Sequence, residues 1–367
     1  MYKVTIAIPV YNSKESIELT LLSALNQTFQ SIEYLIIDDK GTDNSIGIIH
    51  NIIQKHKRGK DIKIIDHIYN RGIGATKNTA IDNATGEYLF FLDSDDYITP
   101  NCIEKLYKAS HGKECCYGSY ITCNKSLEVV DYQRVGRHED SSGIPALAHH
   151  LFMQRGKLYI QTWNKLYKTS FLRKNNIRCS PNTNVDDVFF SFQIQYYCRT
   201  FKCIPDVTYY YLLHSDSTTS GMGGLKYDYA IQLADAYKDI ETFIRTHPAQ
   251  DIQWGHEQTI YYHNKWFIKK VLESKSLDRK QRISLLKDRF SQLRLFGEMS
   301  QYNKQLVNVI SSKNQFTNAK KFIKFLPYTP VKKRKKDPIF LRLKNLINKM
   351  VHKAKKYKIG EIVTLNK

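Results

Sequence analysis

The chain has 367 residues, 42% of them hydrophobic, and is therefore long enough for one large domain or two ordinary ones with a sizeable core. Its formal net charge of +21 favours anionic partners, which include phosphorylated substrates, nucleic acid and membrane surfaces. No apolar run approaches the length of a transmembrane helix, and the seven cysteines lack the paired spacing of a zinc site. The odd number of cysteines and the absence of a secretory signal predict free thiols in a reducing compartment, so we expect a cytoplasmic protein.

The first hundred residues alternate between predicted strands and predicted helices. Short, continuous apolar runs predict strands, and apolar residues spaced three and four apart predict helices. The predicted strands are 4–10, 34–37, 62–65 and 88–92. The predicted helices are one that Asn12 or Ser13 caps, one through 46–53 and one at 77–84. This order predicts an α/β fold, in which helices cover both faces of a parallel sheet.

The order loosens beyond residue 98, and the composition changes after residue 224. The predicted elements are helices at 100–110, 145–153 and 187–197 and strands at 115–123, 127–134 and 207–213, while 157–167 is ambiguous. Three polar helices follow at 227–246, 256–274 and 276–296, and the chain is strongly basic from residue 320. We therefore divide the chain into residues 1–222, with halves 1–98 and 99–222, a helical extension at 223–318 and a basic tail at 319–367.

Three aspartates follow the fourth predicted strand, in the run Asp93-Ser94-Asp95-Asp96. In open α/β sheets, ligands bind at the carboxyl ends of the strands. Because like charges at this spacing repel, the cluster needs a counter-cation. A hard divalent metal, held by one or two carboxylates and by the phosphates of a nucleotide, would supply it. The alternative is a solvated acidic turn that caps the next helix.

Seven short motifs occur in the order and rough spacing of family 2 glycosyltransferases, and the chain resembles this family over residues 3–220. The motifs are Pro9-Val10-Tyr11-Asn12, Asp38-Asp39, Asn70-Arg71-Gly72, Lys77-Asn78, Thr85-Gly86-Glu87-Tyr88, Asp93-Ser94-Asp95-Asp96 and Asp186-Asp187. The resemblance implies the GT-A fold, a mostly parallel sheet flanked by helices, to which this chain adds a helical C-terminal extension. It also implies a hexosyltransferase-class enzyme that inverts the anomeric centre of the donor sugar.

The resemblance implies a nucleotide site at the ends of the first strands. In the family, the aspartate at the position of Asp39 binds the base, and its carboxylate can accept a hydrogen bond from the imide N–H of uracil. The other implied nucleotide- and donor-binding residues are Pro9, Tyr11, Asn12, Arg71, Lys77, Asp93 and Ser94. Arg71 and Lys77 are cations that can neutralise a diphosphate, although relatives usually carry arginine at the position of Lys77. A plain strand end is an equally good interpretation of Pro9 and Tyr11.

Asp95 is the metal ligand that the resemblance implies, and the metal would be Mn²⁺ or Mg²⁺. It would act as a Lewis acid that stabilises negative charge on the departing diphosphate. His214 is a further candidate ligand, because it falls in a loop that closes over the diphosphate and metal in some relatives. A polar surface residue is the alternative for His214. Asp96 is frequent in relatives, and the role that we consider for it is to orient the loop.

A transferase of this kind also needs a base that takes the proton of the acceptor hydroxyl. Asp187 matches the catalytic position of the family, where relatives typically show Glu-Asp, and Asp186 replaces the glutamate. The alternative for either aspartate is a favourable interaction with the dipole of the helix that they open. On the acceptor side, the resemblance implies Asp186, Trp163 and Lys165. Trp163 would stack on a sugar, or else it is an aromatic core residue.

The basic tail contains a predicted amphipathic helix. In residues 338–356, apolar residues fall on one face and most cations on the other, which is the pattern of a helix that lies in a membrane interface. Nucleic acid is a rival partner without a supporting motif. Packing on the catalytic domain, or on another subunit of a homo-oligomer, is a third interpretation. We therefore expect a peripheral protein on the inner face of the cell membrane.

The sequence predicts a metal-dependent glycosyltransferase that moves one sugar from a nucleotide-sugar, with a UDP-sugar favoured, to a hydroxyl of a glycan or lipid-linked glycan in cell-surface polysaccharide synthesis. Processive polymerisation is disfavoured, because no Gln-x-x-Arg-Trp signature is present. One alternative is a sugar nucleotidyltransferase, which should carry a glycine-rich, basic signature near the N-terminus. The other is a non-catalytic glycan- or membrane-binding protein on the same fold.

Overall fold

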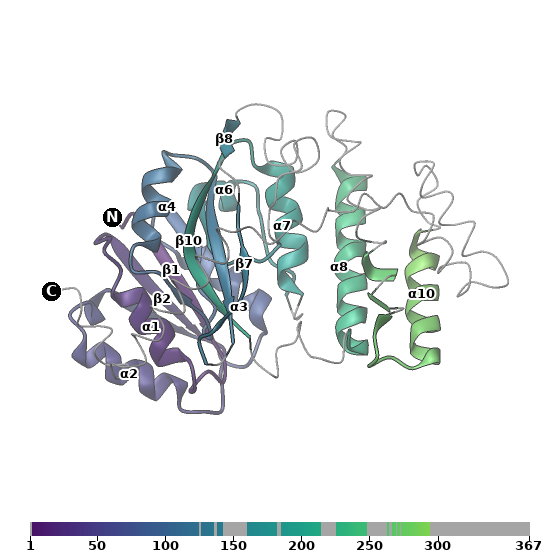
Figure 1. Ribbon diagram of the computed structural model, residues 1–367, viewed down its shortest axis with the longest axis horizontal. Helices are drawn as coiled ribbons and strands as arrows, with labels where there is room; N and C mark the ends of the chain where they lie inside the picture. The colour runs from purple at the N-terminus through teal and green to yellow at the C-terminus, as the bar shows by residue number, and fades with distance from the viewer. Residues whose placement is uncertain are drawn as a thin grey trace. The chain divides into compact units, whose positions relative to one another are not determined.

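The computed structural model describes residues 2–124, 126–135, 138–141, 160–181, 185–213 and 225–247, and beyond these 263, 266–268, 270–271 and 273–293 (Figure 1). The described residues up to 213 form one compact unit, and those from 225 onward form a second. The predicted helix at 145–153, the candidate ligand His214 and the basic tail at 319–367 lie outside the described residues. The division of the chain into three parts stays a prediction.

A mixed β-sheet forms the centre of the first unit. Within the described residues, eight strands follow one another in the order β3-β2-β1-β4-β9-β6-β10-β5, while β7 pairs with β6 and β8 pairs with β10. The strands are β1 (Val4–Val10), β2 (Ile32–Asp38), β3 (Ile62–Asp66), β4 (Tyr88–Phe91), β5 (Tyr97–Ile98), β6 (Cys115–Cys123), β7 (Val129–Gln133), β8 (His138–Ser141), β9 (Lys165–Lys168) and β10 (Phe201–Leu212). The first four in this order are parallel, whereas β9 is antiparallel to both β4 and β6.

Helices cover both faces of the sheet, as predicted (Figure 1). One core contains Ile6 and Ile8 of β1 with apolar residues of α1, α2 and α4, and the other contains Ala7 with residues of α3, α6 and α7. Alternate side chains of a strand point to opposite faces, so one buried strand contributes to both cores. The helices are α1 (Ile17–Leu25), α2 (Ser45–Lys55), α3 (Ile73–Asn83), α4 (Cys102–Ser110), α6 (Thr169–Lys174) and α7 (Asp186–Tyr197), with a 3-10 turn at Gly59–Asp61.

The start of α1 differs from the prediction. The helix begins at Ile17 after Ser16, and not directly after Asn12 or Ser13. Asn12 has a left-handed backbone, with φ of 48°, and its side-chain oxygen accepts a hydrogen bond from Thr42 N at 2.7 Å. The side chain of Asn12 therefore ties the loop after β1 to the loop after β2 and does not cap the helix.

The second unit is helical in its described residues. Its helix α8 (Tyr227–Thr246) coincides with a predicted helix, and α10 (Arg279–Leu293) lies inside another. Arg289 and Glu241 form an ion pair between these helices, with side chains that are 0% and 1% exposed. The guanidinium carbon of Arg289 also lies 5.5 Å from the ring centre of Tyr237. Charged and aromatic groups thus join the two helices inside this unit.

Two expectations from composition can be compared with the structure. Among the described helices, none combines the length and the apolar content that crossing a bilayer requires. All seven cysteines lie in the described residues. All are free, as predicted, and all are buried. Burial raises the pKa of the thiols of Cys102 and Cys179, and raises that of Cys115 to about 12.

Candidate active site

The parallel strands end at a common edge of the sheet, and most of the predicted nucleotide-binding residues lie there. Tyr11 and Asn12 follow β1, Asp39 follows β2 and Asp93 follows β4. Because β2, β1 and β4 are adjacent in the sheet, these loops are neighbours although they are distant in sequence. Residues at such an edge are placed to contact one ligand together.

Lys77 lies between two carboxylates at this edge. Its ammonium nitrogen is 3.5 Å from Asp93 Oδ1 and 3.1 Å from Asp186 Oδ2, and it donates a 2.7 Å hydrogen bond to Thr162 Oγ1. Burial alone lowers the pKa of this lysine, but the charges of Asp186 and Asp93 outweigh burial and raise it. The ammonium thus supplies a positive charge beside the acidic cluster, while the predicted contact of Lys77 with a diphosphate stays a prediction.

Two carboxyl groups near Lys77 have raised pKa values. The surrounding protein desolvates Asp93 and raises its pKa to about 6, against the opposing charge of Lys77. Desolvation and the neighbouring charge of Asp186 raise the pKa of Asp187 to about 7, again against Lys77. A carboxyl group that ionises near neutral pH is suited to take up a proton during a reaction.

Asp186 and Asp187 occupy the first turn of α7 but have different surroundings. Asp186 is 6% exposed and faces the ammonium of Lys77, so its charge is already paired inside the protein. Asp187 is only partly buried. The helix dipole favours negative charge at both positions and does not distinguish them. The burial and the pairing favour Asp187 over Asp186 as a base that a substrate could reach.

Gly74 and Asn78 of α3 hold the segment that leads into α7. A Cβ atom at Gly74 would overlap the carbonyl oxygen of Ser180, so only glycine permits this close approach. Asn78 donates a hydrogen bond to Cys179 O and accepts one from Cys179 N, both at 2.9 Å. These contacts bring Asp186 within reach of Lys77, although more than a hundred residues separate them in the chain.

The loop that carries the acidic cluster is fixed from two sides. Asp96 is buried and accepts hydrogen bonds from the hydroxyl of Tyr209 and the backbone N–H of Leu212, both at 2.8 Å, which supports the loop-orienting role considered for it. The hydroxyl of Ser94 lies 2.6 Å from that of Ser13, in the loop before α1. Asp95, between these two anchored residues, is partly buried.

The carboxylate of Asp39 is surrounded by hydrogen-bond donors. Oδ1 is 2.6 Å from His67 Nδ1 and accepts a 2.9 Å bond from Arg71 N, and Oδ2 accepts a 2.9 Å bond from Gly72 N. His67 is not among the residues that the motifs indicated. Its place two residues after the third predicted strand, at the same edge as Asp39, is the signal that could have found it.

The remaining residues on the nucleotide side differ in exposure. Tyr11 is 49% exposed, and the side chain of Arg71 is also exposed, so a ligand at this edge can reach both. Pro9 is buried inside β1, opposite Ile37 of β2, which corresponds to the strand interpretation of this residue. Asn12 acts through the backbone of Thr42, as described for the fold.

Trp163 lies in an aromatic cluster. Its ring stacks on Tyr209 with a centroid distance of 4.5 Å and an interplanar angle of 8°, and on Tyr211 at 5.5 Å. The ring of Tyr120 meets it edge-on at 4.8 Å. Trp163 is 5% exposed. The structure therefore places it in the core, which is the alternative interpretation, and leaves little of its ring for a sugar.

Lys165 is buried, and its ammonium lies against backbone oxygens. Its ammonium donates to the backbone oxygens of Gln161 and Trp163, and the residue is 3% exposed. Burial lowers its pKa to about 8, with a smaller effect in the same direction from Lys77. Its predicted contact with an acceptor stays a prediction.

The carboxylates of this edge suit a metal that a nucleotide helps to hold. Within the described residues, no group of three or more histidine, cysteine, aspartate or glutamate side chains could hold a metal alone. Asp93 Oδ1 and Asp186 Oδ2 are buried and face the ammonium of Lys77, whereas Asp95, on the same loop, is partly exposed. Carboxylate oxygens are hard ligands, and Mg²⁺ is usually held by one or two of them together with substrate phosphates. The donor set thus fits a metal–nucleotide complex better than a closed protein cage.

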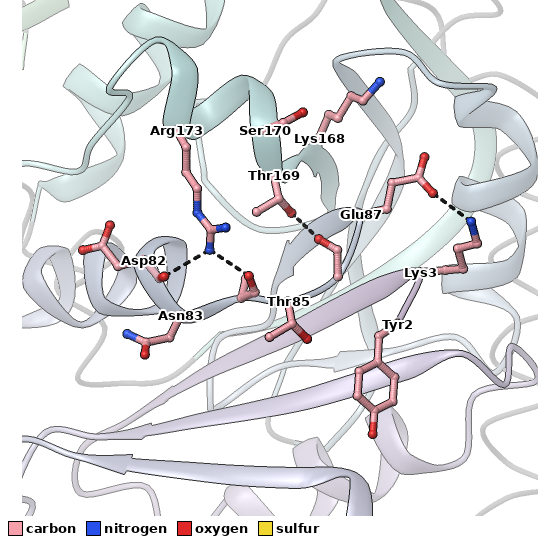
Figure 2. Close-up of a pocket in the computed structure, with 12 residues that line it drawn as sticks. Tyr2, Lys3, Asp82, Asn83, Thr85, Glu87, Lys168, Thr169, Ser170 and Arg173 are labelled. Carbon is pink, nitrogen blue, oxygen red and sulfur yellow. Dashed lines mark hydrogen bonds and ion pairs between the residues drawn. The ribbon is translucent and has the colours of Figure 1, made fainter.

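A cavity of about 900 Å³ lies at the opposite edge of the sheet (Figure 2). Its polar groups are largely paired with one another. Arg173 donates to the backbone oxygens of Ile81 and Ala84, and Lys3 lies 3.3 Å from Glu87. The cavity contains none of the predicted site residues, and its arrangement is that of a packed junction between α3 and α6.

Comparisons with known proteins point to one family. The model described as "Glycosyl transferase family 2" matches residues 5–174. EpsH of Bacillus subtilis (strain 168) is 28% identical over 267 residues, which cover 66% of this chain and 74% of EpsH. The poly(ribitol-phosphate) beta-N-acetylglucosaminyltransferase TarP of Staphylococcus aureus (strain N315) is 29% identical over 227 residues, 58% of this chain and 64% of TarP.

A third relative and a solved structure extend the comparison. The UDP-Glc:alpha-D-GlcNAc-diphosphoundecaprenol beta-1,3-glucosyltransferase WfaP of Escherichia coli is 42% identical over 99 residues, 26% of this chain and 37% of WfaP. The chain thus spans less than two thirds of the length of TarP and of WfaP. The crystal structure of S. aureus TarS 1–349 in complex with UDP-GlcNAc has a TM-score of 0.65 at 18% identity and covers 88% of this chain and 90% of that chain. The likeness to TarS shows a shared fold.

Proposed function

The chain belongs to glycosyltransferase family 2 and is a glycosyltransferase with the GT-A fold, and from this premise we propose that it moves a single sugar from a UDP-sugar to a hydroxyl group of a glycan or lipid-linked glycan. The product would be part of a cell-surface polysaccharide. The observation that carries the proposal is the group of Asp93, Lys77, Asp186 and Asp187 at the carboxyl edge of the parallel strands.

In the proposed reaction, Asp187 is the base. The acceptor hydroxyl oxygen forms a bond to the anomeric carbon, and the bond between that carbon and the diphosphate oxygen breaks, so the configuration inverts. The hydroxyl proton passes to the carboxylate of Asp187, and the diphosphate leaves with the electron pair. The raised pKa of Asp187, about 7, makes its carboxylate a stronger base than an ordinary aspartate.

Asp39, Arg71 and Asp93 would bind the donor. Asp39 would accept a hydrogen bond from the base, and the exposed cation of Arg71 would compensate charge on the diphosphate. Asp93 would contact the ribose or the sugar. The partly exposed ring of Tyr11 would pack beside the nucleoside. Support for a uridine nucleotide also comes from relatives, since WfaP is named for UDP-Glc and TarS was solved with UDP-GlcNAc.

Asp95 would hold a divalent metal, Mn²⁺ or Mg²⁺, with His214, outside the described residues, as a candidate second ligand. When bound, such a metal acts as a Lewis acid for the departing diphosphate. Lys77 would keep Asp93 and Asp186 charged and apart while the donor binds. The fixed positions of Asp96 and Ser94 would hold the loop in place during this step.

The acceptor and the location in the cell are proposed from the names of relatives and from the basic tail. TarP is named for a poly(ribitol-phosphate) acceptor and WfaP for a diphosphoundecaprenol acceptor, and both are surface glycans or their precursors. The cationic, amphipathic pattern of residues 338–356 supports attachment to an anionic membrane surface, where a lipid-linked acceptor would be found.

A screen of nucleotide-sugars tests this function. The purified protein is incubated with each donor and a glycan acceptor, and the released nucleoside diphosphate is measured with Mn²⁺, with Mg²⁺ and with EDTA. We expect release from at least one UDP-sugar, dependent on acceptor and suppressed by EDTA. Release from no UDP-sugar, but from another nucleotide-sugar, would reject the donor class. Release that EDTA leaves unchanged would reject the metal.

A further inference from the structure

His67 lies behind Asp39 and links it to α3. The side chains of both residues are 4% exposed. His67 Nδ1 is 2.6 Å from Asp39 Oδ1, and its other ring nitrogen, Nε2, is 2.9 Å from the hydroxyl of Thr79. The backbone N–H of His67 donates to Asp38 O at 2.9 Å. The imidazole therefore has a partner on each side and cannot turn without losing both.

The hydrogen bonds of the Asp39 carboxylate determine what it can still accept. An ionised carboxylate has about four lone-pair positions, two on each oxygen, and donates nothing. Oδ1 uses both of its positions, for His67 Nδ1 and Arg71 N, whereas Oδ2 uses one, for Gly72 N. Nδ1 must carry the hydrogen in this contact. One acceptor position remains on Oδ2, and its direction is set once the other three are filled.

The same contacts shape the loop that surrounds Asp39. The loop of residues 67–72 follows β3. Two of its backbone N–H groups, of Arg71 and Gly72, and the ring of His67 all contact the carboxylate of Asp39. The loop presents Ile68 and Tyr69 outward, at 91% and 66% exposure, beside Arg71. Without the contact to His67, the carboxylate would keep only the two backbone hydrogen bonds from Arg71 and Gly72. Oδ1 would then regain an unfilled acceptor position, and the carboxylate would no longer offer a ligand one position only.

We propose that His67 is a positioning residue that fixes the Asp39 carboxylate with one free acceptor position, and that this position makes the site prefer uracil to cytosine. The proposal rests on the proposed function, in which Asp39 binds the base. Uracil carries N3–H, a donor that satisfies the free position. Cytosine presents N3 as an acceptor, so two acceptors would face each other and neither would be satisfied. Sites built around a buried polar group reject ligands that leave it unpaired.

Two substitutions of His67 separate its two contacts. The amide nitrogen of asparagine lies close to where Nδ1 was, so His67→Asn retains a donor for Asp39 and loses the contact with Thr79. The longer His67→Gln places its amide near the position of Nε2, so it retains a partner for Thr79 and loses the bond to Asp39. Thr79→Ala is the control that removes only the contact on the side of α3.

The dissociation constants of UDP and CDP are measured by calorimetry on the full chain and on the three variants. We expect the unaltered protein to prefer UDP about tenfold or more. His67→Asn and Thr79→Ala should keep this preference. His67→Gln should bind UDP about tenfold more weakly and CDP as before, so that its preference disappears. A general loss of stability would weaken the binding of UDP and of CDP to the same extent. A selective loss of UDP affinity therefore distinguishes positioning from a purely structural role.

The outcomes separate this inference from the function on which it rests. If the unaltered protein shows no preference for UDP over CDP, both the uridine donor and the role of His67 are rejected. If the unaltered protein prefers UDP, two results for His67→Gln reject only the role of His67. In the first, the variant prefers UDP to the same degree; in the second, its affinities for UDP and CDP fall by the same factor. Should His67→Gln not fold, His67→Leu, which removes both contacts of the ring, takes its place beside Thr79→Ala. A preference that is lost in His67→Leu and kept in Thr79→Ala supports the proposal, and a preference that His67→Leu keeps contradicts it.

Discussion

The ammonium of Lys77 has three oxygen neighbours, two of them carboxylates, in a place that is almost closed to water. A charge of this kind differs from one on the surface. Removing one partner of a buried pair leaves the other charge without compensation and costs about 3–5 kcal/mol, whereas exposed pairs contribute at most about 1 kcal/mol. Lys77 should therefore matter for stability as well as for catalysis.

Lys77→Met should lower the free energy of unfolding by about 3–5 kcal/mol at pH 8, because the buried Asp186 and the partly buried Asp93 lose the charge that compensates them. Lys105→Met is the matched control, since Lys105 pairs with Asp206 at 2.8 Å on the surface, and it should cost less than about 1 kcal/mol. Denaturant unfolding of both variants measures the difference. Equal losses in the two variants would show that the Lys77 cluster is not buried in solution.

The pH dependence of transfer should follow the ionisation of Asp187. Only its carboxylate can take the acceptor proton, and its pKa in the folded protein is about 7, with Asp186, Lys77 and Asp93 as the charges that face it. The value of kcat/KM should therefore rise about tenfold per pH unit below pH 7 and level off above it. Asp187→Asn should lower kcat by about 10²–10⁴-fold at every pH and abolish this rise.

Stability supplies the control for Asp187. Because its folded pKa is raised above the ordinary value, the group stabilises the fold below the ordinary value, and this contribution is lost as the pH rises towards 7. At pH 8 the charged, desolvated side chain of Asp187 destabilises the folded state. Asp187→Asn should therefore unfold at the same temperature as the unaltered protein or at a higher one. An inactive variant that is also clearly less stable would not support a role as base.

The roles of single residues stay predictions, although two of them have structural support. Asp96 accepts a hydrogen bond from Tyr209, which suits a loop-orienting role, and the pKa of Asp187 is raised, which suits a base. Sequence could not show that Lys77 faces Asp186, because that pairing depends on how α3 and α7 pack. It also could not show that Trp163 is covered by other rings, because an aromatic residue has the same pattern in a core as in a sugar site.

At the scale of elements, the contact between α3 and the segment before α7 sets the site. Gly74→Ala places a Cβ against Ser180 O and should cost about 1–3 kcal/mol, and by moving the start of α7 it should lower kcat at least tenfold. Gly112→Ala is the control: its φ is +78°, so alanine is strained there, but no atom lies within 4 Å. This control should lose stability and keep kcat. Unchanged transfer by Gly74→Ala would contradict the link between the two helices.

The parallel half of the sheet was predictable, and the rest was only partly so. β1 and α8 have the predicted bounds, because long apolar periods and flanking turn residues define them in sequence. β9, of four residues, begins at the end of the ambiguous segment 157–167 and extends one residue beyond it, and it is a strand because β4 and β6 pair with it from both sides. Such strands depend on partners that local sequence does not reveal. The predicted cap of α1 was also wrong, because the side chain of Asn12 bonds to Thr42, a partner that is distant in sequence.

At the scale of the whole molecule, the net charge of +21 is unevenly distributed, with a dense run of cations at Lys332, Lys333, Arg334, Lys335 and Lys336. Replacing these five residues by glutamine should weaken binding to vesicles with anionic lipid, by about 1 kcal/mol for each cation near the surface. Glutamine at the exposed Lys55, Lys57 and Lys60 is the control and should change binding little. Co-sedimentation at two salt concentrations measures both; equal weakening would mean that charge alone, without the tail, determines binding.

The seven buried cysteines can serve as natural probes of local opening in this protein. Only the thiolate reacts with alkylating reagents, each thiol is buried, and the pKa values of Cys102, Cys115 and Cys179 are raised, so the native chain should react slowly. A cysteine is modified when the element that carries it opens to solvent. Cys102 reports on α4, Cys123 on the end of β6 and Cys179 on the segment before α7. Mass spectrometry of labelled peptides would thus rank the opening rates of three parts of the first unit without any engineered probe. It would also show which of these parts a bound nucleotide holds closed.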